Sequence, residues 1–160
     1  MFEQGLMAML SVATDPYLLF LIFVTTILGV VIGVLPGLGA TTGAALLLPF
    51  TLTMDPVHAI AVLATIYVSA TFAGSITAIL INTPGTSAAA ATTFDGYPLA
   101  QKGEAGRALG VAVISSTVGG VFSVIILCFA APLLARVAYE FRSPEYFALT
   151  VFGLSMLASI

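Results

Sequence analysis

Two short breaks in otherwise apolar sequence carry the residues whose types and spacing could do chemistry. The first is Leu35-Pro36-Gly37-Leu38-Gly39, which two threonines follow closely. Proline and glycine end a helix, and the freed peptide groups, with the positive N-terminus of the next helix, can face a bound anion. Broken backbone at membrane depth is tolerated only where it is buried in protein or lines a cavity. We therefore expect a binding role for Pro36, Gly37, Gly39, Thr41 and Thr42.

The second break is Asn82-Thr83-Pro84-Gly85-Thr86-Ser87, directly before an alanine-rich segment. Its amides and hydroxyls, at the start of a new helix and without a competing negative charge, suit an anion. The oxygens of Asn82 and Thr83 could also hold a cation such as sodium. The alternative is an ordinary helix N-cap, in which Thr83 or Thr86 satisfies its own helix. Two such breaks in one short chain favour a site, because paired discontinuous helices mark binding sites in secondary transporters.

Few other residues suggest chemistry. Asp95-Gly96 predicts a turn over residues 94–98, and a gating or cation-coupling role for Asp95 is the alternative. His58 follows a proline, which favours a helix start over a proton relay, and Tyr67 lies inside an apolar run where it could line a cavity. The sequence contains no Ser/His/Asp set, metal-ligand cluster or phosphate loop, which argues against an enzyme. The single cysteine, Cys128, excludes a thiolate metal cluster.

The elements that position these residues must lie in a lipid bilayer. Of the 160 residues, 60% are hydrophobic and only 7% are charged, which is too little charge for a soluble domain. The charge-free stretches after Asp15, Asp55 and Arg107 each exceed the roughly 20 residues that a spanning helix needs. These runs are unbroken rather than alternating, so we expect an all-α polytopic membrane protein rather than a barrel. The net charge of −3 offers no basic surface for nucleic acid.

The hydrophobic pattern predicts one membrane domain over residues 1–160 with four to five apolar helices. The expected segments are residues 17–35, 40–52, 57–81, 108–135 and 145–160. The second is too short to cross comfortably, and the last is still apolar at Ile160, so we expect a piece of something longer or a helix completed against a partner. Residues 86–93 predict a short helix buried against protein. Met1–Asp15 has no basic residue, so it is interpreted as a flanking segment at the membrane surface rather than a signal peptide.

Glycines inside the expected helices predict local behaviour. Gly29 and Gly33 recur at helical spacing, and the resulting face without side chains favours close packing against another helix. Gly119-Gly120 predicts a weak point in the fourth span.

The ordered motifs resemble one known family, the large membrane subunit of the tripartite tricarboxylate transporters (TctA family). The resemblance rests on Leu35–Gly39, Leu80–Thr86, Asp95–Ala100 with Gly103 and Ala105-Gly106, and Ser143–Phe147. It implies a multi-pass transporter of the bacterial inner membrane for citrate or related di- and tricarboxylates. It also implies a sodium or proton gradient as driving force, no further cofactor, a small membrane subunit and a periplasmic solute-binding protein as partners.

Family members are much longer and consist of repeated halves. The resemblance therefore implies that this chain is the N-terminal portion, and that the rest of the transporter or a second copy completes the site. The alternative function is a non-transporting membrane scaffold or assembly subunit, whose glycine-rich faces only pack against partners. Thr86→Val and Asn82→Leu separate the two, because only a transport site would lose carboxylate uptake.

Overall fold

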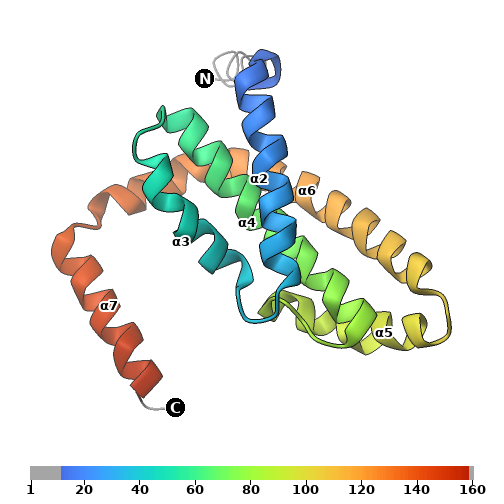
Figure 1. Cartoon of the computed structure of the whole chain (residues 1–160). Coiled ribbons are helices and arrows are strands. Elements are labelled where there is room, and N and C mark those ends of the chain that lie inside the picture. The colour runs from blue at the N-terminus through green and yellow to red at the C-terminus, as the bar shows by residue number, and fades with distance from the viewer. Residues whose placement is uncertain (1–11, 159–160) are drawn as a thin grey trace. The chain divides into compact units, whose positions relative to one another are not determined.

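The computed structural model describes residues 12–158, and these contain helices and no strand, which confirms the predicted all-α class. In chain order the helices are α2 (Pro16–Val34), α3 (Gly39–Thr51), α4 (Pro56–Ile81), the short 3-10 helix η1 (Ser87–Ala89), α5 (Ala90–Gln101), α6 (Ala105–Glu140) and α7 (Ser143–Ala158) (Figure 1). The chain forms two compact units, Met1–Ser116 and Thr117–Ile160. Both predicted breaks lie in the first unit.

The helices α2 and α4 begin with the same device. Asp15 precedes α2 and accepts hydrogen bonds from the backbone N–H groups of Tyr17 and Leu18, at 2.9 and 3.3 Å. Asp55 precedes α4 and accepts from the N–H of Val57 at 3.0 Å. A proline follows each aspartate, where its fixed φ suits the first helical turn and its missing N–H costs nothing. Both starts are therefore fixed by local sequence.

Glycine and other small residues bring α2 and α4 into close contact. A Cβ added at Gly29 would lie 3.0 Å from the Ile66 carbonyl oxygen, and one added at Gly33 would lie 2.6 Å from the Ala70 Cα. The buried residues at this interface include Thr25, Gly29, Gly33, Val62, Ile66, Ser69, Ala70, Ala73 and Gly74. The predicted packing role of Gly29 and Gly33 is confirmed. Backbones that approach this closely gain dispersion energy along the whole interface.

Each predicted break ends a helix. α2 stops at Leu35, which is extended (φ −79°, ψ 113°), as expected for a residue that precedes proline. Gly37 (φ +92°) and Gly39 (φ +40°) then take left-handed backbone angles that favour glycine. α4 ends at Asn82, which is also left-handed (φ 56°, ψ 26°) and donates its backbone N–H to the Thr77 carbonyl. Both breaks are thus built into the backbone.

The turn predicted over residues 94–98 is wrong, because α5 continues through it to Gln101. Gly96 lies directly against α4, where an added Cβ would be 2.7 Å from Ile79 Cγ1. This tertiary contact outweighs the local turn preference of Asp-Gly. The turn comes later, at Gly103, whose φ is +82°. Of residues 86–93, only Ala89 is buried, so the short helix predicted there is more open than expected.

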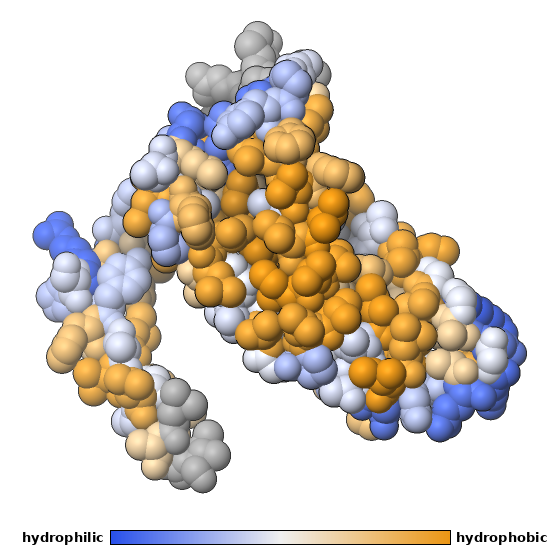
Figure 2. Space-filling view, in the orientation of Figure 1, coloured by the Kyte–Doolittle hydropathy of each residue, from blue (hydrophilic) through white to orange (hydrophobic). Residues whose placement is uncertain are grey.

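The outer surface of the described helices is largely apolar. Three of them, α2, α4 and α6, are long and apolar enough to cross a membrane, and Figure 2 shows hydrophobic side chains covering much of the visible face of the first unit. α6 continues through Gly119-Gly120 without a break, and the lower helix stability predicted there stays a prediction. The flanking segment expected over residues 1–15 lies mostly outside the described residues, as does the end of the last apolar run.

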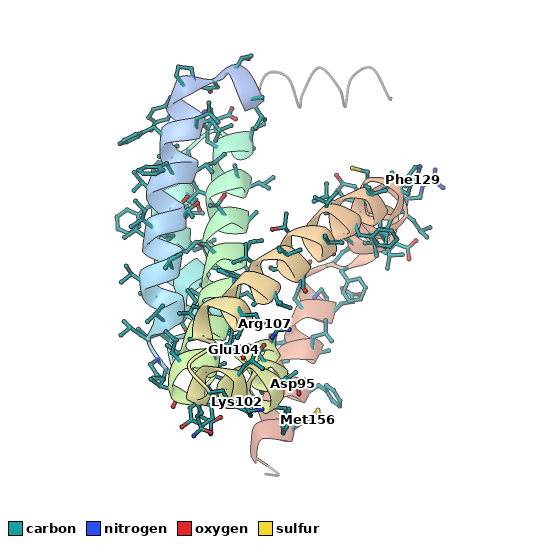
Figure 3. All side chains as sticks on the ribbon, turned by 90° about the vertical axis from the view of Figure 1, so that its right-hand side faces the viewer. Asp95, Lys102, Glu104, Arg107, Phe129 and Met156 are labelled. Atoms are coloured by element: carbon teal, nitrogen blue, oxygen red, sulfur yellow. The ribbon has the colours of Figure 1, made fainter. Side chains whose placement is uncertain are left out.

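Charged side chains gather at the turn between α5 and α6. Figure 3 shows Lys102, Glu104 and Arg107 together there, and the Arg107 guanidinium donates to Glu104 at 2.9 Å. All three are exposed. Exposed charge of this kind is stable in water or among lipid headgroups, so this turn marks a polar end of the first unit.

His58 joins the starts of α2 and α4. Its Nε2 lies 3.1 Å from Asp15 Oδ2, and its Nδ1 lies 3.6 Å from Asp55 Oδ1. The Tyr17 ring lies against the imidazole, with 5.6 Å between the ring centroids. His58 is a helix-start residue, as predicted, and it also connects two helices far apart in sequence.

Acid should weaken this connection. Hydrogen bonds from the Leu18 and Tyr17 N–H groups, together with nearby His58, hold the pKa of Asp15 below its ordinary value. A lowered folded-state pKa gives stability above the unfolded-state pKa, and that stability is lost as pH falls through the folded-state pKa. Thermal unfolding in detergent should therefore show a falling Tm below about pH 4. Asp15→Asn should lower Tm at pH 7 and make Tm depend less on pH below about pH 4. If Tm of Asp15→Asn falls with pH in the same way as Tm of the unchanged protein, ionised Asp15 does not stabilise the fold.

Candidate functional site

The two predicted breaks meet at one polar cavity of about 220 Å³ within the first unit. The first break contributes Gly37, Gly39 and Thr41, and the second contributes Gly85, Thr86 and Ser87. The remaining walls are Ala40, Tyr67, Thr71 and Ala88. Segments about 45 residues apart in the sequence therefore form a single site, because the α2–α4 contact brings the ends of both helices together.

Other residues predicted for the site lie outside the cavity lining. These are Pro36, Thr42, Asn82, Thr83 and Pro84. Asn82 and Thr83 instead finish α4: the Thr83 N–H donates to the Thr77 carbonyl at 3.3 Å, and the Thr83 hydroxyl donates to the Ile81 carbonyl at 3.2 Å. Pro36 and Pro84 shape the two breaks without facing the cavity.

Hydrogen-bond donors at the cavity are left without capping side chains. α3 starts after Leu38 and η1 after Thr86, and neither residue makes a side-chain cap hydrogen bond. The first N–H groups of a helix have no partner inside the helix, so those at the start of α3 remain available. η1 leads directly into α5, and its Ala89 N–H donates to the Thr86 carbonyl at 3.1 Å. The N-cap alternative for Thr86 is therefore wrong.

The Thr86 hydroxyl is an unusual group at this site. Its oxygen is buried, and among the residues that the structure describes it has no hydrogen-bond partner. A buried hydroxyl without a partner costs about 1–3 kcal/mol. A ligand that accepts this hydrogen bond would recover that energy, so the hydroxyl favours a bound acceptor.

The polar cavity has an electrostatic character that suits a bound anion, although its side chains are uncharged. None of its lining residues carries a charged side chain. The helix start at α3, whose residues Gly39, Ala40 and Thr41 line the cavity, contributes a partial positive charge. A carboxylate could be held there by N–H and O–H donors alone.

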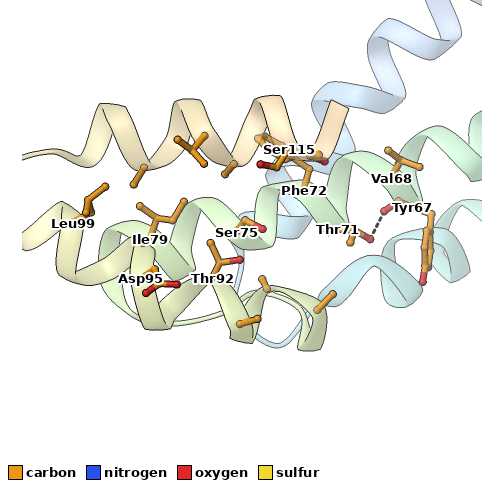
Figure 4. A pocket seen from close by; sticks show the side chains of 18 residues that line it. Tyr67, Val68, Thr71, Phe72, Ser75, Ile79, Thr92, Asp95, Leu99 and Ser115 are labelled. Carbon is orange, nitrogen blue, oxygen red and sulfur yellow. Dashed lines mark hydrogen bonds between the residues drawn. The ribbon is translucent and has the colours of Figure 1, made fainter. Parts of the chain in front are cut away.

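A second, larger cavity of about 570 Å³ adjoins the polar one. It is lined by α4, α5 and the first turns of α6, and Figure 4 shows Ser75 and Ile79 of α4 near Thr92 of α5, and Phe72 beside Ser115 of α6. Most of its lining is apolar, and Asp95 brings the only charge among the lining residues. Asp95 thus lines this cavity rather than the polar one.

Three residues, Tyr67, Thr71 and Ala88, line both cavities. The prediction that Tyr67 lines a cavity is confirmed. Thr71 escaped prediction, although it lies one turn after Tyr67 on the same face of α4, and its hydroxyl donates to the Tyr67 carbonyl at 2.7 Å. This spacing of one helical turn from Tyr67 could have predicted that Thr71 lines the same cavity.

Comparison with known proteins identifies the family. Residues 19–160 match the sequence model of the family described as the tripartite tricarboxylate transporter TctA family. A protein of Agrobacterium vitis, described as an uncharacterized 52.8 kDa protein in the TAR-I ttuC' 3' region, is 49% identical over 138 residues. The alignment covers 86% of this chain and 28% of that relative. No solved structure matches significantly.

The chain therefore spans less than a third of this longer relative. The family match covers most of the chain and includes both breaks that line the polar cavity. It also agrees with the three helices that can cross a membrane. This membrane chain belongs to the tripartite tricarboxylate transporter TctA family.

Proposed function

We propose that the polar cavity between the two breaks is the carboxylate-binding part of a secondary transporter. The observation that carries the proposal is the meeting of both breaks at one cavity, with the unpartnered Thr86 hydroxyl beside it. Discontinuous helices in secondary transporters place half-helix ends at the substrate in this way. The substrate is citrate or a related di- or tricarboxylate, and transport proceeds by alternating access.

The family match supports a proposal for the coupling ion and the partners. A sodium or proton gradient across the bacterial inner membrane drives uptake, and no other cofactor takes part. Sodium would lie near Asn82 and Thr83, where side-chain oxygens stand at an exposed helix end. A periplasmic solute-binding protein delivers the carboxylate, and a small membrane subunit assembles with this chain. The longer relative supports a site that the remaining part of the transporter, or a second copy, completes. Asp95, in the neighbouring cavity, is the candidate for gating.

Thr86→Val tests this proposal, because valine keeps the shape of threonine and removes only the hydroxyl. A hydrogen bond to a charged group is worth about 1.5–3 kcal/mol, so uptake at low substrate concentration should fall by about 10- to 100-fold. The measurement is sodium-dependent uptake of labelled citrate into proteoliposomes that contain the transporter with its partners. Thr86→Ser, which keeps the hydroxyl, is the matched control and should retain most of the uptake. Unchanged uptake with Thr86→Val would refute the proposal.

A scaffold function remains the second candidate, and one observation favours it. The apolar window of α6 has no buried residue, so this helix presents its side chains to lipid or to partner helices. A pure scaffold would keep full uptake with Thr86→Val and Asn82→Leu, and it would lose assembly when bulky charged residues are placed on α6. Uptake and co-purification of the partner subunit, measured on the same variants, separate the two functions.

A further inference from the structure

Three glycines from different parts of the first unit meet beside the polar cavity. Gly33 belongs to α2, Gly74 to α4 and Gly85 to the second break, and we call them the glycine junction. A Cβ added at Gly85 would collide with the Gly33 carbonyl oxygen and lie 2.9 Å from the Gly74 Cα. All three glycines are buried. The second break is therefore pressed against both long helices by backbone contacts.

A hydrogen bond fixes the break at this point. The Gly85 N–H donates to the Gly74 carbonyl at 3.2 Å, and the Thr77 hydroxyl also donates to that carbonyl at 3.2 Å. Gly74 lies about two turns before the end of α4, so this bond folds the break back along the helix that it has just left. The position of Gly85 relative to α4 is thus set by Gly74.

Thr86 lies directly on Gly74. A Cβ added at Gly74 would be 2.9 Å from both the backbone nitrogen and the Oγ1 of Thr86, and 3.0 Å from its Cγ2. Contacts that short require movement, and a backbone nitrogen cannot turn aside as a flexible side chain can. The space above Gly74 is therefore what allows Thr86 to hold its hydroxyl oxygen in a buried position.

We infer that Gly74 is a positioning residue for the carboxylate site, acting through Gly85 and Thr86. The inference rests on the proposed function, because it concerns the same cavity. Gly74 lines neither cavity. It holds the donor groups of the second break at the distance from the first break that the cavity requires.

The test replaces Gly74 with alanine in the complete transporter and measures the apparent KM and the maximal rate of labelled citrate uptake. Displacement of Thr86 should raise the apparent KM by at least 10-fold, with a much smaller change in the maximal rate per folded molecule. Adding Thr86→Ser removes the Cγ2 contact and leaves the contact with the backbone nitrogen, so Gly74→Ala/Thr86→Ser should regain only a small part of the affinity. Gly110→Ala, which places a Cβ in open space, is the control and should match the unchanged protein.

The outcomes separate this inference from the proposed function. A normal KM in folded Gly74→Ala would overturn the positioning role even if Thr86→Val abolishes uptake. Unchanged uptake with Thr86→Val would instead overturn the proposed site itself. Should Gly74→Ala reduce the folded yield, thermal unfolding in detergent replaces uptake: Thr86→Ala added to Gly74→Ala should then raise Tm. Thr86→Ala is measured both in the unchanged protein and in the Gly74→Ala variant. If it lowers Tm by the same amount in both, residues 74 and 86 are not coupled and the inference fails.

Discussion

Replacing Ser87 with aspartate should weaken carboxylate binding about 100-fold, whereas replacing it with asparagine should weaken binding only slightly. Ser87 is exposed and lines the polar cavity, so either side chain fits without disturbing the core. Aspartate adds a negative charge to a cavity whose lining residues carry none. At about 5 Å from a bound carboxylate, with an effective dielectric constant of about 20, the repulsion is about 3 kcal/mol. That is a loss of affinity of about 100-fold.

The pair of variants makes the Ser87 experiment a test of charge alone, because aspartate and asparagine have nearly the same size. Equilibrium binding of labelled citrate to the purified transporter at pH 7 is the measurement. Equal losses in both variants would show that bulk, rather than charge, matters at this position. Retained binding with Ser87→Asp would mean that the cavity does not hold an anion.

Replacing Gly33 with alanine should have the largest effect on stability. The added methyl group would collide with the Ala70 carbonyl oxygen and would lie 2.6 Å from the Ala70 Cα and 2.8 Å from its carbonyl carbon. Backbone atoms cannot move aside singly, so α2 and α4 would have to separate. Overpacking of this kind costs about 3 kcal/mol. The two breaks would also move apart, because the α2–α4 contact holds them together.

The matched control for Gly33 is Gly43→Ala in α3. A Cβ there would lie 3.4 Å from the Ile32 Cγ2 and 3.6 Å from the Ile66 Cδ1, which are ordinary contacts with side chains that can shift. Its cost should stay below about 1 kcal/mol. Unfolding in detergent, followed by circular dichroism, compares the two variants. Equal stability of both would contradict the close approach of α2 and α4.

Local sequence signals were sufficient to predict α2, α3, α4 and the two breaks. The predicted apolar segments over residues 17–35, 40–52 and 57–81 each lie within a residue of the observed bounds of α2, α3 and α4. Proline and glycine start or end a helix through their own backbone conformation. The effect of the aspartate-proline pairs and of Pro36-Gly37 can therefore be predicted without knowing the fold. Paired discontinuous helices mark binding sites in secondary transporters, which led to the prediction that both breaks serve one site. The structure places both breaks at one cavity.

Features that depend on contacts between distant residues could not be predicted. The turn expected around Asp95 is helical because Gly96 packs on Ile79, and nothing in residues 94–98 reveals that contact. The link between His58 and Asp15 joins residues 43 positions apart. Gly74 reads as one small residue among many in α4, and its role emerges only where Thr86 lies against it.

The most direct test of a shared carboxylate site asks whether one ligand protects both breaks. Thr41→Cys on the first break and Ser87→Cys on the second would be labelled with a membrane-permeable maleimide, in a background where Cys128, which is exposed, is replaced by serine. Thr42→Cys is the control, because Thr42 is exposed next to Thr41 but does not line the cavity.

Citrate should slow labelling of Thr41→Cys and Ser87→Cys with the same half-maximal concentration and leave Thr42→Cys unaffected. Protection of only one break, protection at different concentrations, or no protection at either position would contradict a single site formed by both breaks.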